Sequence, residues 1–170
     1  MSMKSRFPYV VFVVVFLLLG CSGGYSFTGA SIPPNAHTIS VATFPNYAST
    51  VNPQLSQKLT DDLRNMFSTQ TSLNVVNGDA DMEITGEITA YNTTAAALSA
   101  NDDVSMNRLT ISIKVKFENN ADPDASFEQT FTRYRDFSAQ LNFSSIENTL
   151  VGEIVAELCE DVFNKSVVNW

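Results

Sequence analysis

Side chains able to carry out catalysis are few in this sequence of 170 residues. His37 is the one histidine, and it follows a Pro-Pro segment. Serines and aspartates are plentiful, but no serine lies in the strand–turn–helix context that is typical of a nucleophile elbow. We therefore expect His37 to be a surface or hydrogen-bonded residue. The alternative is a hydrolase in which a serine or aspartate lies within hydrogen-bond reach of its imidazole.

Patterns for metal and phosphate binding are missing from the sequence. One histidine and one free cysteine cannot form a usual zinc ligand set. Asp79-Ala80-Asp81 and Asp102-Asp103 lack the glycine and the distal glutamate of a calcium loop. No glycine-rich phosphate cradle occurs either. We expect no metal, no cofactor and no enzymatic activity.

Basic side chains in a strand predicted at 108–117 are the remaining candidates. Arg108, Lys114 and Lys116 alternate with apolar residues, so all three are expected on the outward face of a sheet. Arg133 and Arg135, in the next predicted strand, are expected nearby. Lysine and arginine bind phosphate well, so these five are candidates for contact with a phosphate-bearing lipid or an acidic partner wall. The alternative is cross-strand pairing with acids of the same face, which are Glu83, Glu87 and Glu128.

Two amphipathic helices and several strands must position these residues. Helical spacing of apolar residues predicts a helix over 53–69, beginning at Asn52-Pro53. A second helix follows Ser144-Ser145-Ile146-Glu147, which has the form of a capping box. Alternation and β-branched residues predict strands over 38–44, 73–76, 82–90, 108–117 and 127–137. The order predicts one α+β domain over 37–170, with two helices on one face of a four- to five-stranded, mostly antiparallel sheet.

Two strands carry specific expectations about which side chains face the core. In the strand over 82–90, Met82, Ile84, Ile88 and Ala90 are expected on one face. The stretch from Asn92 to Asp103 is expected to be a frayed or bulged strand end and loop. In the strand over 127–137, placing the phenylalanines inward also sends Arg133 and Arg135 inward. We expect a β-bulge to resolve this conflict.

The first 20 residues have the composition of a bacterial export signal. Lys4 and Arg6 precede an apolar run over 10–19, which is too short for a comfortable membrane span. The following Leu18-Leu19-Gly20-Cys21 resembles a lipobox, in which the cysteine is acylated and becomes the first mature residue. We expect a signal peptide over 1–20, a lipid-anchored Cys21 and a lipidated N-terminal segment over 21–36. An uncleaved anchor helix is the alternative.

The residues after Cys21 favour one membrane. An aspartate next to the cysteine often retains enterobacterial lipoproteins in the inner membrane, and an acidic cluster resembles a surface-export tag. Neither occurs in Ser22-Gly23-Gly24-Tyr25. We expect an outer-membrane protein that faces the periplasm.

Charge and cysteine content exclude further classes. The chain has 18 acidic and 10 basic residues, for a net charge of −8. General nucleic-acid binding requires clustered positive charge, so it is excluded. With Cys21 attached to lipid, Cys159 has no partner for an intramolecular disulfide. It lies beside apolar positions of a predicted helix, so we expect a buried, unreactive thiol.

Several segments together resemble a known family. In chain order they are Gly24-Tyr25-Ser26-Phe27-Thr28-Gly29-Ala30, Ile39-Ser40-Val41 with Phe44-Pro45-Asn46, Asn107-Arg108-Leu109-Thr110-Ile111, Phe127-Glu128-Gln129 with Tyr134-Arg135-Asp136-Phe137, and Phe163-Asn164-Lys165 to Asn169-Trp170. Their order and spacing resemble the lipopolysaccharide-assembly lipoprotein (LptE) family in its Bacteroidetes form. The resemblance implies a small α+β lipoprotein that plugs the outer-membrane β-barrel LptD, takes part in inserting lipopolysaccharide and catalyses no reaction. The alternative is a free-standing periplasmic lipoprotein that binds a lipid or small ligand.

Overall fold

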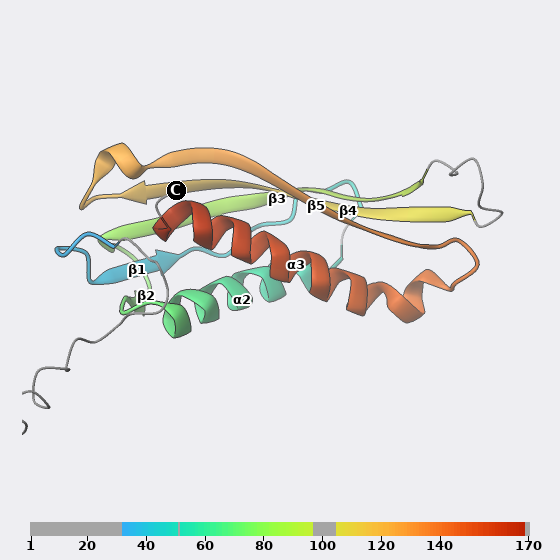
Figure 1. Cartoon of the computed structure of the whole chain (residues 1–170), viewed down its shortest axis with the longest axis horizontal. Helices are drawn as coiled ribbons and strands as arrows, with labels where there is room; N and C mark the ends of the chain where they lie inside the picture. The colour runs from blue at the N-terminus through green and yellow to red at the C-terminus, as the bar shows by residue number, and fades with distance from the viewer. Residues whose placement is uncertain (1–31, 51, 97–104, 169–170) are drawn as a thin grey trace, which may run out of the picture.

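The computed structural model describes residues 32–50, 52–96 and 105–168. The predicted signal peptide and Cys21 lie outside these residues. Two helices lie on one face of a five-stranded sheet (Figure 1). In chain order the elements are β1 (Thr38–Val41), α2 (Leu55–Gln70), β2 (Asn74–Val76), β3 (Met82–Ala95), β4 (Met106–Asn119), the 3₁₀ turn η1 (Pro123–Ala125), β5 (Phe127–Ser138) and α3 (Phe143–Val167).

The sheet has the strand order β2-β1-β3-β4-β5 and is mixed. Strand β1 pairs in parallel with both β2 and β3, whereas β3–β4 and β4–β5 are antiparallel. Strands β1 and β2 are parallel because α2 carries the chain from the end of β1 back to the start of β2. Parallel neighbours need such a crossover connection. The predicted α+β fold is confirmed. The sheet departs from the expected mostly antiparallel pairing only at this short parallel edge.

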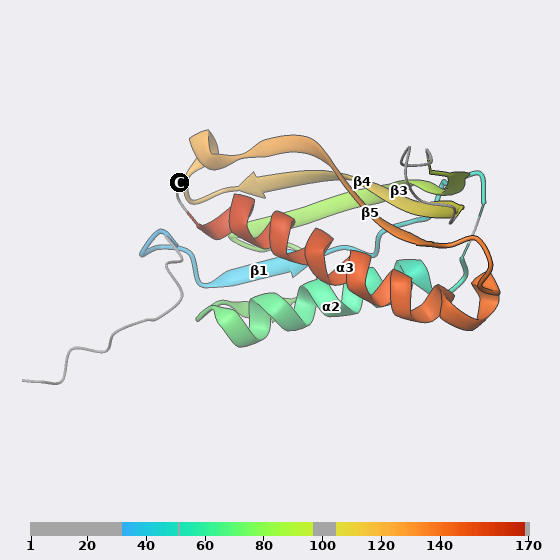
Figure 2. The same cartoon turned by 45° about the vertical axis from the view of Figure 1, so that its right-hand side comes forward.

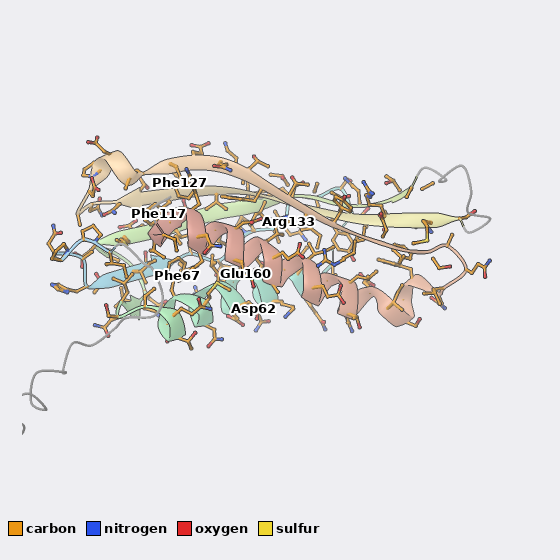
Figure 3. The ribbon with its side chains drawn as sticks, viewed as in Figure 1. Asp62, Phe67, Phe117, Phe127, Arg133 and Glu160 are labelled. Carbon is orange, nitrogen blue, oxygen red and sulfur yellow. The ribbon has the colours of Figure 1, made fainter. Side chains whose placement is uncertain are left out.

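The hydrophobic core lies between the helices and the sheet. Helix α2 lies nearer β1, and α3 lies nearer β5 (Figure 2). The apolar stripe predicted along α2 is buried, and alternate residues of β4 are fully buried; these are Leu109, Ile111, Ile113, Val115 and Phe117. Phe67 of α2, Phe117 of β4 and Phe127 of β5 lie toward one end of the molecule (Figure 3). Burial of these faces is the main force that holds the two layers together.

A bulge in β3 changes which residues reach the core. The register with β4 shifts between Ile88 and Ala90, so Thr89 is an extra residue. The alternation therefore inverts: Tyr91 is buried, and Ala90 is only half-buried. The prediction that Ala90 shares the core face is wrong for this reason. The strand also continues to Ala95 through exposed residues, because backbone pairing with β4 holds a stretch that has no buried side chains.

Both helices begin differently from the sequence expectation. Helix α2 begins at Leu55, and the Asn52 side chain accepts a hydrogen bond from the Gln54 amide at 3.0 Å. Helix α3 begins at Phe143, where the Asn142 side chain accepts from the Ser144 amide at 3.1 Å. The predicted capping box is therefore wrong, because Asn142 takes the capping position two residues earlier.

One glycine allows an aromatic ring to lie directly on the sheet. Gly86 lies on the core face of β3, and a Cβ atom there would overlap the ring of Phe44 and the carbonyl oxygen of Lys114. Phe44 follows β1 and is fully buried. The absence of a side chain at Gly86 thus creates the space that this ring fills.

Candidate interaction surface

Three of the five predicted basic residues lie on the open face of the sheet, away from the helices. Arg108, Lys114 and Lys116 occupy alternate positions of β4, as the sequence indicated. Each has a side chain that is between 37% and 50% exposed. The alternation of β4 therefore places the three cations on one accessible surface.

Each cation of this surface already has an acidic partner. The Arg108 guanidinium donates two hydrogen bonds to Asp136, at 2.7 and 2.9 Å. Lys114 Nζ lies 2.5 Å from Glu128 Oε1. Lys116 Nζ lies 2.8 Å from an oxygen of Glu118. The expected cross-strand pairing is thus present at Glu128, and Glu118, which sequence reasoning missed, is the second partner.

The ion pairs shift the ionisation of these groups in opposite directions. The hydrogen bond from Arg108 lowers the pKa of Asp136, and the one from Lys114 lowers the pKa of Glu128. The same contacts raise the pKa of Lys114, and Glu118 raises the pKa of Lys116. Each of the three cations is therefore neutralised by an acidic partner, and Glu83 and Glu87 of β3 add further negative charge to the same face. An external phosphate or carboxylate must exchange with an internal carboxylate in order to bind.

Hydroxyl groups and one tyrosine complete the open face. Ser112 Oγ and Thr132 Oγ1 lie 2.8 Å apart, joining β4 to β5. The Tyr134 ring is half-exposed and lies 3.7 Å from the guanidinium carbon of Arg108. A shallow depression of about 310 Å³ spans β3 to β5, and its lining is Thr85, Gly86, Glu87, Lys114, Lys116 and Glu128. The face is therefore polar and accessible to solvent.

Arg133 and Arg135 lie on the opposite face of the sheet. The β4–β5 register runs without interruption, so Arg135 is opposite Leu109 and Arg133 is opposite Ile111. The predicted bulge in this strand is wrong. Because β5 is an edge strand, its inward side chains can extend past the core to the polar flank of α3. The five basic residues consequently form two groups, with three on the open face and two under the edge.

Helix α3 supplies the partners of the second group. Arg133 donates to both oxygens of Asp161, with Nε 2.7 Å from Oδ2. Arg135 donates to Glu153 at 2.9 Å and also contacts Glu157. Arg133 lies between β5 and α3 (Figure 3). These contacts raise the pKa of Arg135 and lower that of Glu157, and they attach the helix to the edge strand.

A polar cluster at the start of α3 was not predicted. The Tyr91 hydroxyl donates to Glu147 Oε1, and Asn52 Nδ2 donates to the same oxygen at 2.8 Å. Burial raises the pKa of Tyr91, and the bond to Glu147 adds to this effect. The cluster joins β3, α3 and the segment before α2. No local pattern could reveal it, since Glu147 lies 56 and 95 residues from its two partners.

The two candidate reactive residues occupy structural positions. His37 is exposed, and no hydrogen bond to its imidazole is found within the described residues. Its backbone amide donates to Asp81 Oδ2 at 2.8 Å, which lowers the pKa of Asp81. Cys159 is fully buried, as predicted, and burial raises its pKa to about 12. The hydroxyl or carboxylate that a hydrolase would need at His37 is not beside the imidazole in this part of the chain.

A metal site and a membrane-spanning helix are two further features that the described residues do not contain. Over 32–50, 52–96 and 105–168, no three His, Cys, Asp or Glu side chains are placed to hold a metal ion. Within the same segments, no helix combines the length and the apolar composition needed to cross a membrane.

Solved structures share this fold at low sequence identity. A minor lipoprotein from Acinetobacter baumannii is 13% identical, with a TM-score of 0.50 over 76% of this chain and 91% of its own. Lipoprotein B from Nitrosomonas europaea is 17% identical, with a TM-score of 0.50 over 80% and 83%. A protein from Xanthomonas campestris is 9% identical, with a TM-score of 0.52 over 79% and 87%. At these identities the similarity concerns the fold alone.

Comparison of the sequence with known proteins identifies the family. No curated protein matches the sequence. The family model LptE, described as lipopolysaccharide-assembly, matches residues 36–166, which is most of the chain. The match includes every helix and strand of the described residues except the last residue of α3. The chain therefore belongs to the LptE lipopolysaccharide-assembly family.

Proposed function

We propose that this protein is a non-catalytic, outer-membrane lipoprotein subunit of the lipopolysaccharide transport and assembly machinery, and that it partners the β-barrel LptD. The family match over residues 36–166 is the observation that carries this proposal. Its role is structural: it occupies or supports the barrel while lipopolysaccharide passes. The absence of enzymatic activity is part of this proposal, and it rests on the same family match.

The open face of the sheet is the proposed contact surface with the barrel wall. The lumen of a large outer-membrane barrel is polar, so a surface of hydroxyls and paired charges complements it. Arg108, Lys114 and Lys116 contact acidic groups of the wall, or phosphates of lipopolysaccharide, by exchanging their internal carboxylates. Such an exchange costs little because each pair is half-exposed and weakly stabilising.

Arg133 and Arg135 have a secondary place in this proposal. Their guanidinium groups bind carboxylates of α3, so they hold the helix on the edge strand that carries the open face. They contact lipopolysaccharide or the partner only if those carboxylates release them.

The lipid anchor at Cys21 completes the proposed arrangement. Several acyl chains hold a protein firmly at a bilayer, since each buried methylene adds about 0.8 kcal/mol. Anchoring confines the domain to the periplasmic side of the outer membrane. It thereby raises the effective concentration of the domain at the barrel.

Recovery of the tagged protein from its own outer membranes in mild detergent tests this proposal. We expect a large β-barrel in stoichiometric amount, identified by mass spectrometry. A Cys21→Ala variant serves as the control for anchoring, and we expect much less barrel with it. Recovery of the wild-type protein alone, from membranes that contain the barrel, would contradict the proposal and favour the free-standing ligand-binding lipoprotein.

A further inference from the structure

The outer edge of β5 carries backbone groups that no strand of the described chain pairs. Strand β5 is last in the order β2-β1-β3-β4-β5. The Ala139 amide donates to Ser105 O at 2.9 Å, which extends the β4–β5 register by one pair. Hydrogen-bonded pairs recur at every second residue of an antiparallel ladder. Odd-numbered residues of β5 therefore bond to β4, and even-numbered residues direct their N–H and C=O groups outward.

Protection of this edge is uneven along the strand. Toward its C-terminal end, Arg135 Nη1 donates to the outward carbonyl of Tyr134 at 3.0 Å. Inward-pointing charges such as Arg133 and Arg135 also discourage the pairing of folded sheets. No hydrogen bond to the outward backbone groups of Thr130 or Thr132 is found among the residues that the structure describes. The outward groups of Thr130 and Thr132 are therefore open, whereas the outward carbonyl of Tyr134 is occupied.

A groove runs along the open half. It has a volume of about 420 Å³ and is lined by five consecutive residues of β5, Gln129 to Arg133, and by Asp161, Asn164 and Lys165 of α3. Consecutive residues alternate between the two faces of a strand, so a groove lined by all five follows the edge and not one face. The three α3 residues form the wall on the helical side. In Figure 1, the C-terminal half of α3 lies below β5.

The charges of the groove indicate what it accepts. Arg133 is bound to Asp161 by two hydrogen bonds. Lys165 has no carboxylate within 4.0 Å among residues 32–50, 52–96 and 105–168, and its Nζ lies 5.8 Å from the centre of the Phe127 ring. A carboxylate on an incoming chain would therefore find one available cation.

From these features we propose that the β5–α3 groove binds an extended segment of a partner protein as a sixth strand. The backbone of that segment exchanges hydrogen bonds with Thr130 and Thr132, and an acidic side chain of the segment pairs with Lys165. Addition of a strand to an exposed sheet edge is an established mode of peptide recognition. This site lies on a different surface from the proposed barrel contact, so either proposal can fail without the other.

A synthetic peptide of alternating threonine and valine, with one glutamate near its end, is the probe. The full chain, purified in mild detergent, is titrated with the peptide while backbone amide exchange is followed by NMR. We expect the Thr130 and Thr132 amides to exchange about tenfold more slowly when the peptide is bound, as hydrogen-bonded amides do. An otherwise identical peptide, N-methylated on the amides that face β5, should give no protection.

Variants test the geometry of the same site. Thr132→Pro removes an outward N–H and no backbone bond to β4, and it also loses the hydroxyl that lies beside Ser112 Oγ, as the valine variant does. Affinity should fall about tenfold, the equivalent of one lost hydrogen bond. Thr132→Val keeps the N–H and should bind like the wild type. Lys165→Glu should reverse the preference for the acidic peptide over one with lysine in its place.

Three outcomes would overturn the proposal. Equal binding of the methylated and unmethylated peptides, measured on the wild-type chain, excludes strand addition even if the proline variant does not fold. Protection that maps to β3 or to the open face places the peptide elsewhere. A dimer that forms without peptide and protects Thr130 and Thr132 assigns the edge to a second copy of this chain.

Discussion

Individual residues decide how closely the two layers approach. Gly86 and Phe44 form one such contact, since the ring occupies the place of a side chain on β3. Tyr91 and Glu147 form another, because their hydrogen bond joins β3 to the beginning of α3. Neither pair is evident from local sequence. We expect substitutions at both pairs to lower the free energy of unfolding.

Gly86→Ala should lower the free energy of unfolding by about 1–3 kcal/mol, the usual cost of an extra carbon in a packed core. Chemical denaturation measures the change. Gly152→Ala is the matched control: it lies in α3, where an added Cβ meets only the Lys58 side chain at 3.9 Å. That variant should gain about 0.5–1 kcal/mol from the better helix propensity of alanine. Equal effects of the two variants would contradict the packing that we describe.

Tyr91→Phe should cost about 1.5–3 kcal/mol, the usual range for a hydrogen bond to a charged group. Tyr134→Phe is the control, because the hydroxyl of this half-exposed tyrosine makes no hydrogen bond to the described residues. Its effect should be within about 0.5 kcal/mol. A double-mutant cycle with Glu147→Gln, measured by urea denaturation, should show strong coupling. Strict additivity of the two changes would mean that the Tyr91–Glu147 bond is not formed.

At the scale of elements, a hydrogen-bonded clamp joins the beginnings of β1 and β3. Asp81 Oδ2 accepts from the His37 amide, the Thr38 amide and the Thr38 hydroxyl, at 2.8, 3.0 and 2.8 Å. These bonds favour the ionised carboxylate and hold the pKa of Asp81 below 3.8, its value in the unfolded chain. The clamp therefore fixes the parallel pairing that the sequence did not predict.

The clamp predicts a dependence of stability on acid. Because the pKa is lower in the folded state, its stabilising contribution is full above pH 3.8 and is lost as the pH falls through the folded-state pKa. Asp81→Asn should remove this part of the acid sensitivity, so its stability should change less than that of the wild type below pH 3.8. Urea midpoints measured from neutral pH down to acid pH check this. An Asp124→Asn control, in the exposed turn η1, should keep the wild-type profile.

The fold was predictable from sequence where the pattern is local, and not where it depends on distant partners. Five alternating apolar residues define the buried face of β4, and they correctly placed Arg108, Lys114 and Lys116 on the open face. The positions of Arg133 and Arg135 depend on β5 being an edge strand beside α3, which is a property of strand order. The expected capping role of Glu147 gave way to Tyr91 and Asn52, which lie far away in the chain.

The whole molecule has two unlike surfaces. The helical layer carries acidic residues such as Asp62 and Glu160 (Figure 3), whereas the sheet exposes hydroxyls and balanced ion pairs on its other face. The acidic helical layer is suited to stay exposed to solvent in the proposed complex. The open sheet face is suited to lie against another polar surface, and this assignment carries the proposed function.

Charge reversal on each surface should show which of the two contacts the barrel. Lys114→Glu together with Lys116→Glu places repulsion on the open face and should reduce the recovered barrel about tenfold, since like charges brought together cost several kcal/mol. The matched control is Asp62→Lys with Glu160→Lys on the helical layer, which should leave recovery unchanged. Quantitative mass spectrometry of both preparations provides the comparison. Loss of the barrel only in the helical variant would assign the contact to the opposite side.

Site-specific photocrosslinking in intact cells tests the central claim most directly. A photoreactive amino acid replaces Lys116 on the open face or Glu160 on the helical layer, and the adducts are identified by mass spectrometry. We predict a crosslink from position 116 to the outer-membrane barrel of the lipopolysaccharide machinery, and a weaker one or none from position 160. Crosslinks from neither position to that barrel, in cells where both proteins are present, would contradict the assignment of this protein as its partner.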